Sequence, residues 1–252
     1  MAVNVRLIGG YHSENGTATA SSTATGYDAA NVVPLDRPTK WKSNVTTASW
    51  IEIDCGSAVA VTGACIANHN GGGWSGAEVQ YYDGATWQTA GAALSGLSST
   101  ADHFITFSVQ TRQRWRIYTS GATAAMEVGV FYLGTATTLS KNPSYGSTEG
   151  DVFNVESARA TSGAIVAEKY GRRIARFELP FDRENSTLKS EIRDFIREED
   201  GPLRPFFYVP ADESGSSVQG VAYMVRMDAL SLVHTRLFNN VYQTKLVLLE
   251  EV

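Results

Sequence analysis

One loop in the first half of the chain groups side chains that could bind a ligand. Asn68, His69 and Asn70 stand next to one another and are followed by three glycines. Trp74 comes directly after the glycines. Amides and an imidazole can hydrogen-bond hydroxyl groups, and an indole can stack on a sugar ring. The loop therefore predicts a carbohydrate-binding site. The alternative is a loop that buries Trp74 against its own domain or a neighbouring subunit.

The chain carries no motif typical of an enzyme or a metal protein. Its four histidines are scattered, without the H-x-x-x-H or C-x-x-C spacing of metal ligands. It lacks a Gly-x-Ser-x-Gly elbow, a P-loop and a dinucleotide fingerprint. We therefore expect no catalysis, no cofactor and no bound metal. A glycan hydrolase stays a third alternative, because glycosidase carboxylates have no fixed spacing in sequence.

Composition favours a β-rich chain of two domains. The chain has 252 residues, which suits two domains of common size. It is 43% hydrophobic and 19% charged and has 23 glycines, a composition typical of short strands joined by turns. A net charge of -5 and the lack of a basic stripe argue against duplex DNA as a ligand. With neither a signal-peptide core nor a run of roughly 20 apolar residues, we expect a soluble chain without a membrane span.

Alternating apolar residues predict about eight strands before residue 134. The clearest hairpin joins residues 78–82 to residues 85–88 through Asp83 and Gly84, a pair that suits a tight turn. Residues 51–55 and 59–66 predict two further strands joined by a hairpin or a sharp corner. Few large apolar side chains occur between residues 135 and 151, which predicts a linker. Other strand candidates lie at 103–109, 115–118 and 126–132. We therefore expect domains at 1–140 and 141–252.

The second half combines strands with one helix. Leu188, Ile192 and Phe195 have the spacing of one buried helical stripe, and Asn185 or Ser186 is a suitable N-cap. This pattern predicts a helix at about residues 186–199, ended by the glycine and proline at 201–202. The strand candidates of this half lie at 154–161, 164–179, 205–209, 221–232 and 241–249.

Several short segments of the first half follow one another in a characteristic order. They are Ala29-Ala-Asn-Val, Asp36-Arg-Pro-Thr-Lys-Trp-Lys-Ser43, Trp50-Ile-Glu-Ile-Asp-Cys-Gly56, Val79-Gln-Tyr-Tyr and Arg114-Trp-Arg-Ile117. This order resembles the discoidin, or F5/8 type C, family. The resemblance implies a galactose-binding-like jelly-roll β-sandwich at residues 1–140, with Trp41 and Trp50 packed in its core. Cys55 stands where the family commonly has leucine, and the disulfide of secreted members is missing, which points away from an extracellular adhesion protein.

The second half contains the predicted helix, its G-P-L-R-P-F-F-Y exit and the final strand candidate at 241–249. These features carry a similarity to the ring-forming domain of phage distal tail and baseplate hub proteins. It implies a tail-tube-like β-sandwich or barrel with one α-helix, in a ring that is most simply a hexamer. The partners implied are other tail proteins, namely tube and hub, with DNA only as passing cargo. The location implied is the virion tail, assembled in the bacterial host cytoplasm.

Two functions follow from these resemblances. The first is a structural component of a phage tail tip, in which Phe206, Phe207 and Tyr208 pair with neighbouring subunits, although at least half of them are expected to face their own core. The alternative is a carbohydrate-binding module that contacts a cell-surface glycan. The two are compatible if a virion uses the sandwich to touch a host glycan.

Overall fold

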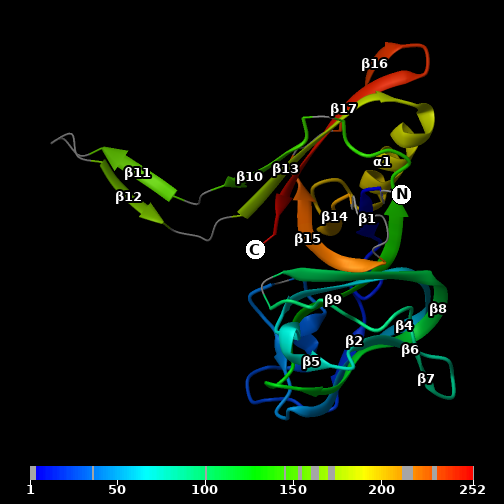
Figure 1. The fold of residues 1–252 in the computed structure, drawn as a ribbon, viewed down its shortest axis with the longest axis vertical. Coiled ribbons are helices and arrows are strands. Elements are labelled where there is room, and N and C mark those ends of the chain that lie inside the picture. Colours follow the sequence, from blue (N-terminus) through cyan, green and yellow to red (C-terminus); the bar gives the residue numbers. More distant parts are fainter. Residues whose placement is uncertain are drawn as a thin grey trace.

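The protein is built mainly of β-strands, as the sequence predicts, and Figure 1 shows two packed parts and a separate hairpin. This computed structural model describes residues 4–35, 37–99, 101–144, 146–152, 155–159, 165–169, 174–211, 218–228 and 232–251. Within these ranges, no helix has the length and apolar character needed to cross a bilayer.

The first part is a β-sandwich built around two long, bent strands. Its strands are β2 (Thr17–Ala20), β3 (Trp41–Lys42), β4 (Thr47–His69), β5 (Trp74–Ser75), β6 (Glu78–Tyr82), β7 (Trp87–Thr89), β8 (Asp102–Ala122) and β9 (Glu127–Thr138). Two short 3-10 helices, Ala29–Val32 and Gly71–Gly73, lie in its loops. The hairpin around Gly84 is confirmed, with β6 paired to β7.

Several expected strands of the sandwich are continuous. Residues 51–55 and 59–66 belong to the single strand β4, so their junction is a corner and the hairpin alternative is wrong. Gly56 sits at this corner with a φ of 75°, which glycine adopts at little cost, and the pairing register shifts between Asp54 and Val59. Residues 103–109 and 115–118 likewise form one strand, β8. The separate-strand predictions failed because a bulge or a corner can bend a strand without ending it.

The core of the sandwich is apolar and closed. Trp41, Ile51, Ile53, Trp115 and Ile117 are all fully buried in one cluster. Isoleucine and tryptophan alternate with polar residues along β4 and β8, so each strand turns one face inward and the other outward.

The second part packs one helix on a sheet. Its strands are β1 (Arg6–Gly9), β10 (Thr148–Val152), β13 (Ile174–Glu184), β14 (Phe206–Val209), β15 (Gln219–Met227), β16 (Thr235–Phe238) and β17 (Val241–Glu250). Helix α1 (Ser186–Glu198) confirms the predicted helix, and its cap is Asn185, whose side chain accepts a hydrogen bond of 2.8 Å from the Leu188 amide. Leu188 and Ile192 are buried with the β13 and β17 side chains, as the stripe predicts.

The sandwich is inserted between β1 and the rest of the second part. Val5 and Leu7, at the start of the chain, are buried in the same cluster as the α1 side chains. Strand β1 pairs with β14 on one side and with the end of β9 on the other, where Gly9 lies opposite Thr135. The predicted boundary near residue 140 stays a prediction, and the packing places β1 with the second part.

A third apolar cluster joins the two parts. Phe207 of β14 is fully buried and meets Tyr132 of β9 edge to face, with ring centroids 5.1 Å apart. The backbone is also shared, because residues 219–222 of β15 pair with residues 102–105 of β8. The parts are therefore joined by both side-chain packing and sheet hydrogen bonds.

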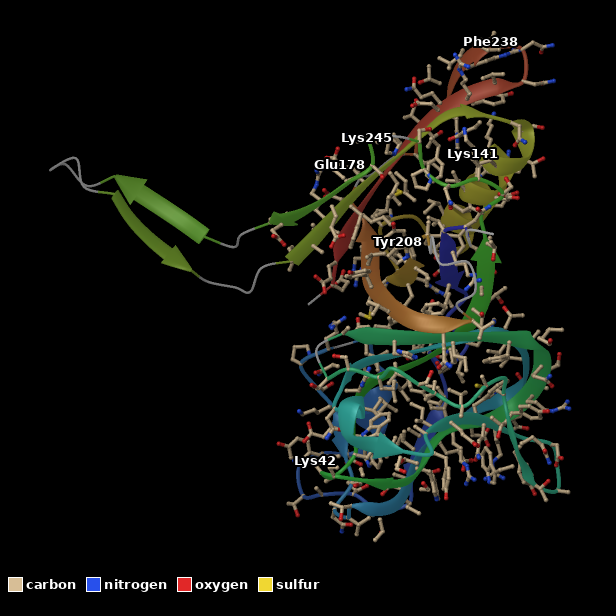
Figure 2. The ribbon with its side chains drawn as sticks, viewed as in Figure 1. Lys42, Lys141, Glu178, Tyr208, Phe238 and Lys245 are labelled. Atoms are coloured by element: carbon tan, nitrogen blue, oxygen red, sulfur yellow. The ribbon has the colours of Figure 1, made fainter. Side chains whose placement is uncertain are left out.

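Two hairpins project from this body. Strands β11 (Val155–Arg159) and β12 (Ile165–Lys169) pair with each other in a two-stranded sheet, and no other described strand joins them; Figure 1 shows this sheet away from the body. The predicted strands at 154–161 and 164–179 cover this hairpin and the start of β13, although residues 154, 160–164 and 170–173 lie outside the described ranges. The predicted linker is shorter than expected, because β9 extends to Thr138 and β10 begins at Thr148. Figure 2 shows Phe238 at the tip of the β16–β17 hairpin.

Candidate functional site

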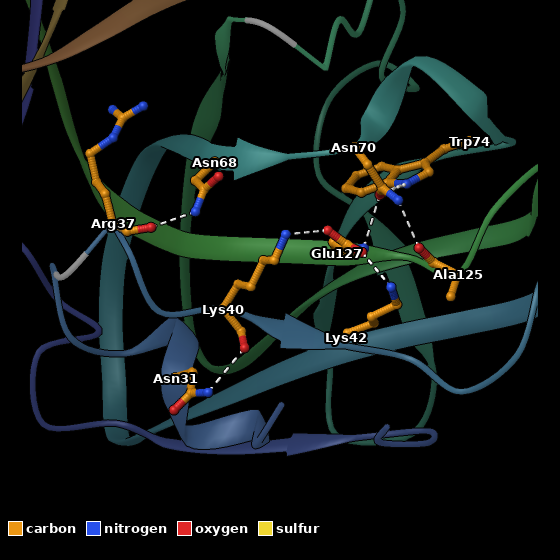
Figure 3. A network of polar contacts seen from close by, with 9 residues as sticks. All are labelled: Asn31, Arg37, Lys40, Lys42, Asn68, Asn70, Trp74, Ala125 and Glu127. Carbon is orange, nitrogen blue, oxygen red and sulfur yellow. Dashed lines mark hydrogen bonds and ion pairs between the residues drawn. The ribbon is translucent and has the colours of Figure 1, made fainter. Parts of the chain in front are cut away.

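The structure gathers the four predicted loop residues, but it turns their polar atoms inward. The Asn70 side-chain oxygen accepts hydrogen bonds of 2.9 Å from the Trp74 indole and from the Glu127 amide. Its nitrogen donates to the Ala125 carbonyl at 2.7 Å, and the Asn68 side chain donates to the Arg37 carbonyl (Figure 3). Both amides therefore hold the loop in place, which favours the alternative that Trp74 packs against its own sandwich.

His69 is the buried member of these four residues. Its side chain is 6% exposed, and its Nδ1 atom accepts a hydrogen bond of 3.0 Å from the Gly71 amide. Among the described residues, its buried Nε2 atom has no hydrogen-bond partner. Burial lowers the pKa of His69 to about 4. The imidazole is therefore neutral near pH 7 and belongs to the interior.

Acidification should destabilise the protein through His69. Because its pKa falls from 6.5 in the unfolded chain to about 4 on folding, its contribution is fully present above pH 6.5 and is lost as the pH falls through 4. That contribution is roughly 3 kcal/mol. Urea unfolding of the wild type and of His69→Gln at pH 7 and pH 4 measures it. We expect a smaller loss of stability in the variant, and equal losses would contradict this role.

A second surface lies on the outside of the sheet β2–β4–β8–β6–β7. Here the residues between the buried ones on each strand point outward. We call this surface the outer face. Its residues are Thr17, Thr19, Trp50, Glu52, Asp54, Glu78, Gln80, Tyr82, Trp87, Thr89, Arg114, Arg116 and Tyr118.

The strand register aligns these side chains in rows. Thr17 lies opposite Asp54, Asp54 lies opposite Arg114, and Tyr82 lies opposite Trp87. Tyr81 of β6 pairs with Trp115 of β8 in an antiparallel register, so the next residue of β6, Tyr82, lies opposite Arg114. One row therefore crosses all five strands, from a hydroxyl at one edge to an indole at the other.

Arginines and aromatic rings alternate over the outer face. The Arg116 guanidinium lies 4.2 Å from the centroid of the Trp87 ring and 5.2 Å from that of Tyr118. Arg114 lies 4.8 Å from the Tyr82 centroid. The Nε atom of Arg114 donates to Glu52 at 2.6 Å, and that of Arg116 donates to the Gln80 side chain at 2.8 Å. These bonds fix the guanidinium groups and so position the rings.

The two arginines differ in their electrostatics. The hydrogen bond to Glu52 raises the pKa of Arg114. Burial against its neighbours lowers the pKa of Arg116, although the group stays charged at any physiological pH. On the outer face, the charge of Arg114 is therefore balanced by Glu52, whereas Arg116 lies between aromatic rings and the Gln80 amide.

A groove of about 470 Å³ opens at the β2 edge of the outer face. Asp54 accepts two hydrogen bonds of 2.8 Å through its Oδ1 atom, one from the Gly56 amide and one from the Gln113 side chain. Hydroxyls, carboxylates, amides and a guanidinium thus meet in one hollow, a set that can pair with the hydroxyls of a sugar. Its lining residues are Asn15, Thr17, Thr19, Glu52, Asp54, Gly56, Gln113 and Arg114.

The sequence contained a signal for this surface. Polar residues alternate with apolar ones in Thr17-Ala-Thr-Ala and in Arg114-Trp-Arg-Ile-Tyr, which marks one solvent-facing side of each strand. Trp41 is buried as the family resemblance implies. Trp50 is only half-buried and stands on the outer face opposite Tyr118, so its assignment to the core is wrong.

The remaining predicted site residues lie inside the second part. Phe206 and Phe207 are fully buried and Tyr208 is 5% exposed, so all three fill the core of their own chain, with Tyr208 shown in Figure 2. Exposed apolar side chains of this part include Leu237 and Phe238 instead. Within the described ranges, no three histidine, cysteine or acidic side chains come together as a metal-binding group.

Comparison with known proteins places the first part in a family. Residues 17–124 match the F5/8 type C domain, which confirms the resemblance of this half. No curated protein matches the chain. The similarity of the second half to phage tail proteins stays a prediction.

Solved structures similar to this chain include several binding modules. Chitosan-binding module 1 of a chitosanase/glucanase from Paenibacillus sp. IK-5 is 22% identical, with a TM-score of 0.44 over 50% of this chain and 98% of that one. The lectin domain of lectinolysin, complexed with Lewis B antigen, is 15% identical, with a TM-score of 0.41 over 50% and 96%. The family 32 carbohydrate-binding module of C. perfringens NanJ, in complex with galactose, is 14% identical, with a TM-score of 0.43 over 52% and 99%.

Proposed function

We propose that the F5/8 type C domain at residues 17–124 binds a carbohydrate on its outer face. The observation that carries this proposal is a groove of hydrogen-bonding groups beside aromatic rings on one sheet face. Proteins bind carbohydrates through both kinds of contact, because a pyranose ring has apolar faces and a rim of hydroxyls. Tyr82 and Trp87 supply the apolar contact, and the groove supplies the polar one.

The function proposed is binding without turnover. In the groove, Glu52 is tied to Arg114 at 2.6 Å, and Asp54 is tied to backbone and side-chain donors. These bonds suit carboxylates that orient a ligand. Incubation with a bound polysaccharide should therefore release no new reducing ends.

Trp87→Ala should lower glycan binding by at least about tenfold, a loss of roughly 1.4 kcal/mol. The ring is half-buried and packs mainly against surface arginines, so its removal should leave the fold intact. A glycan array followed by titration with the best glycan measures the effect.

Trp74→Ala is the matched control, because it makes the same change in the loop at residues 68–74. That variant should bind as the wild type does. Loss of binding in Trp74→Ala alone would move the site to the loop, and an array without any signal for the wild type would remove the proposal.

A second role is favoured by the two projecting hairpins. An isolated two-stranded hairpin is marginally stable in water, and no third strand pairs with β11–β12 among the residues that the structure describes. Leu237 is 46% and Phe238 60% exposed on β16. We propose that neighbouring subunits cover these hairpins in a ring at a phage tail tip, where the chain would display its sugar-binding domain. Light scattering and negative-stain images should then show a closed ring, and a monodisperse monomer would contradict this role.

A further inference from the structure

We infer that the outer face takes an extended linear glycan of about four sugars, bound across the strands, in place of a single terminal sugar. This inference rests on the proposed function and adds the class of ligand. It is carried by the row that runs from Thr17 through Asp54, Arg114 and Tyr82 to Trp87.

The length of the row sets the length of the ligand. Neighbouring strands lie about 4.8 Å apart, so five strands with four intervals span roughly 19 Å. In an extended glycan each sugar adds one six-membered ring and one linking oxygen, a length comparable to one such interval. A ligand that contacts both ends of the row must therefore contain about four sugars.

The two ends of the row provide different contacts. The groove at the β2 edge holds Thr17 and Asp54, which pair with hydroxyls. The β7 edge holds Trp87, whose ring centroid lies 5.4 Å from that of Tyr82. A single sugar can use the polar end or the aromatic end, but it is too short to use both. Only a chain gains both sets of contacts at once.

The edges of the sheet leave the row open along its axis. Among the described strands, β2 pairs only with β4, and β7 pairs only with β6, so no further strand continues the sheet at either end. A polysaccharide could therefore continue past both edges. The row thus fits an internal segment of a polymer as well as a free oligosaccharide.

The loop at residues 68–74 argues in the same direction. A terminal sugar is gripped from several sides, which requires free hydrogen-bonding groups that converge on a pocket. The Trp74 indole instead donates to the Asn70 side chain, and the Asn70 amide is also bonded to the backbone at Ala125 and Glu127. The groups of the outer face lie along a line, an arrangement that suits a linear ligand.

Oligosaccharides of one to six sugars, prepared from cellulose, chitin, galactan and polygalacturonate, test this inference with the full chain. For a series that binds, affinity should rise by at least about tenfold from one sugar to four and then level off. Asp54→Asn and Trp87→Ala change opposite ends of the row. Each should weaken binding of the tetrasaccharide more than that of the disaccharide, whereas Trp74→Ala should leave the length dependence unchanged.

The outcomes separate the inference from the function on which it rests. A monosaccharide that binds as tightly as its tetrasaccharide would overturn the linear-ligand inference and leave carbohydrate binding standing. Equal losses for all lengths in Trp87→Ala would also overturn it. Absence of binding in every series would remove the proposed function and the inference together.

Discussion

Replacing Asp102 with asparagine should lower the free energy of unfolding by about 3 to 5 kcal/mol, the usual cost of breaking a buried ion pair. Asp102 accepts two hydrogen bonds from the Arg37 guanidinium, at 2.5 and 3.0 Å. The two side chains are only 6% and 10% exposed. The variant keeps the shape of the side chain but leaves the Arg37 charge without its counter-ion in a nearly dry site.

Asp102 also holds the end of β4 in place, because its Oδ1 atom accepts a hydrogen bond of 3.2 Å from the backbone amide of Asn68. Urea unfolding followed by tryptophan fluorescence suits this measurement, since all five tryptophans lie within residues 17–124. The matched control is Asp28→Asn, the same chemical change at an exposed residue whose side chain makes no capping bond. The control should change stability by less than about 0.5 kcal/mol. Similar effects of the two substitutions would show that the Arg37 pair contributes little.

Phe207→Ala should both destabilise the protein and uncouple its two parts. Truncation of a fully buried phenylalanine costs about 3 to 5 kcal/mol. Phe207 lies in the cluster that joins the sandwich to the second part, against Tyr132. Its loss removes contacts between the parts and leaves the centres of the two other clusters unchanged.

Two signals follow the two parts separately. Tryptophan fluorescence reports on the sandwich, and the helical band in far-UV circular dichroism reports on α1 of the second part. In the wild type the two unfolding curves should coincide, and in Phe207→Ala they should separate. Phe181→Ala is the control, because Phe181 is equally buried but lies in the apolar cluster of the second part, which contains the α1 side chains. Its curves should shift together, and curves that are already separate in the wild type would contradict the coupling.

Local patterns in the sequence were enough to predict the local elements. Leu188 and Ile192 recur at the helical period and Asn185 caps α1, because all the contacts that define a helix lie within a few residues. Gly84 likewise marked the β6–β7 turn, where it has a φ of 107°. The length of β4 was missed, because a corner at Gly56 within a continuous strand resembles the end of one.

The candidate site was harder to predict, because its residues come from five strands. Thr17 and Trp87 are far apart in sequence, and they share a row only through the pairing registers of β2, β4, β8, β6 and β7. The loop at residues 68–74 was conspicuous because its polar residues are adjacent, yet adjacency does not determine whether an amide faces solvent. The Asn70 amide faces its own backbone.

The pairing of Gly9 with Thr135 has an evolutionary consequence. The chain leaves the second part to form the sandwich, and returns to it, at two residues that pair across one β-ladder, with Cα atoms at most about 5.5 Å apart. A domain whose two ends lie this close together can be exchanged for another without changing the chain path of the second part. Related chains could therefore keep the second part and replace the inserted sandwich in a single recombination step.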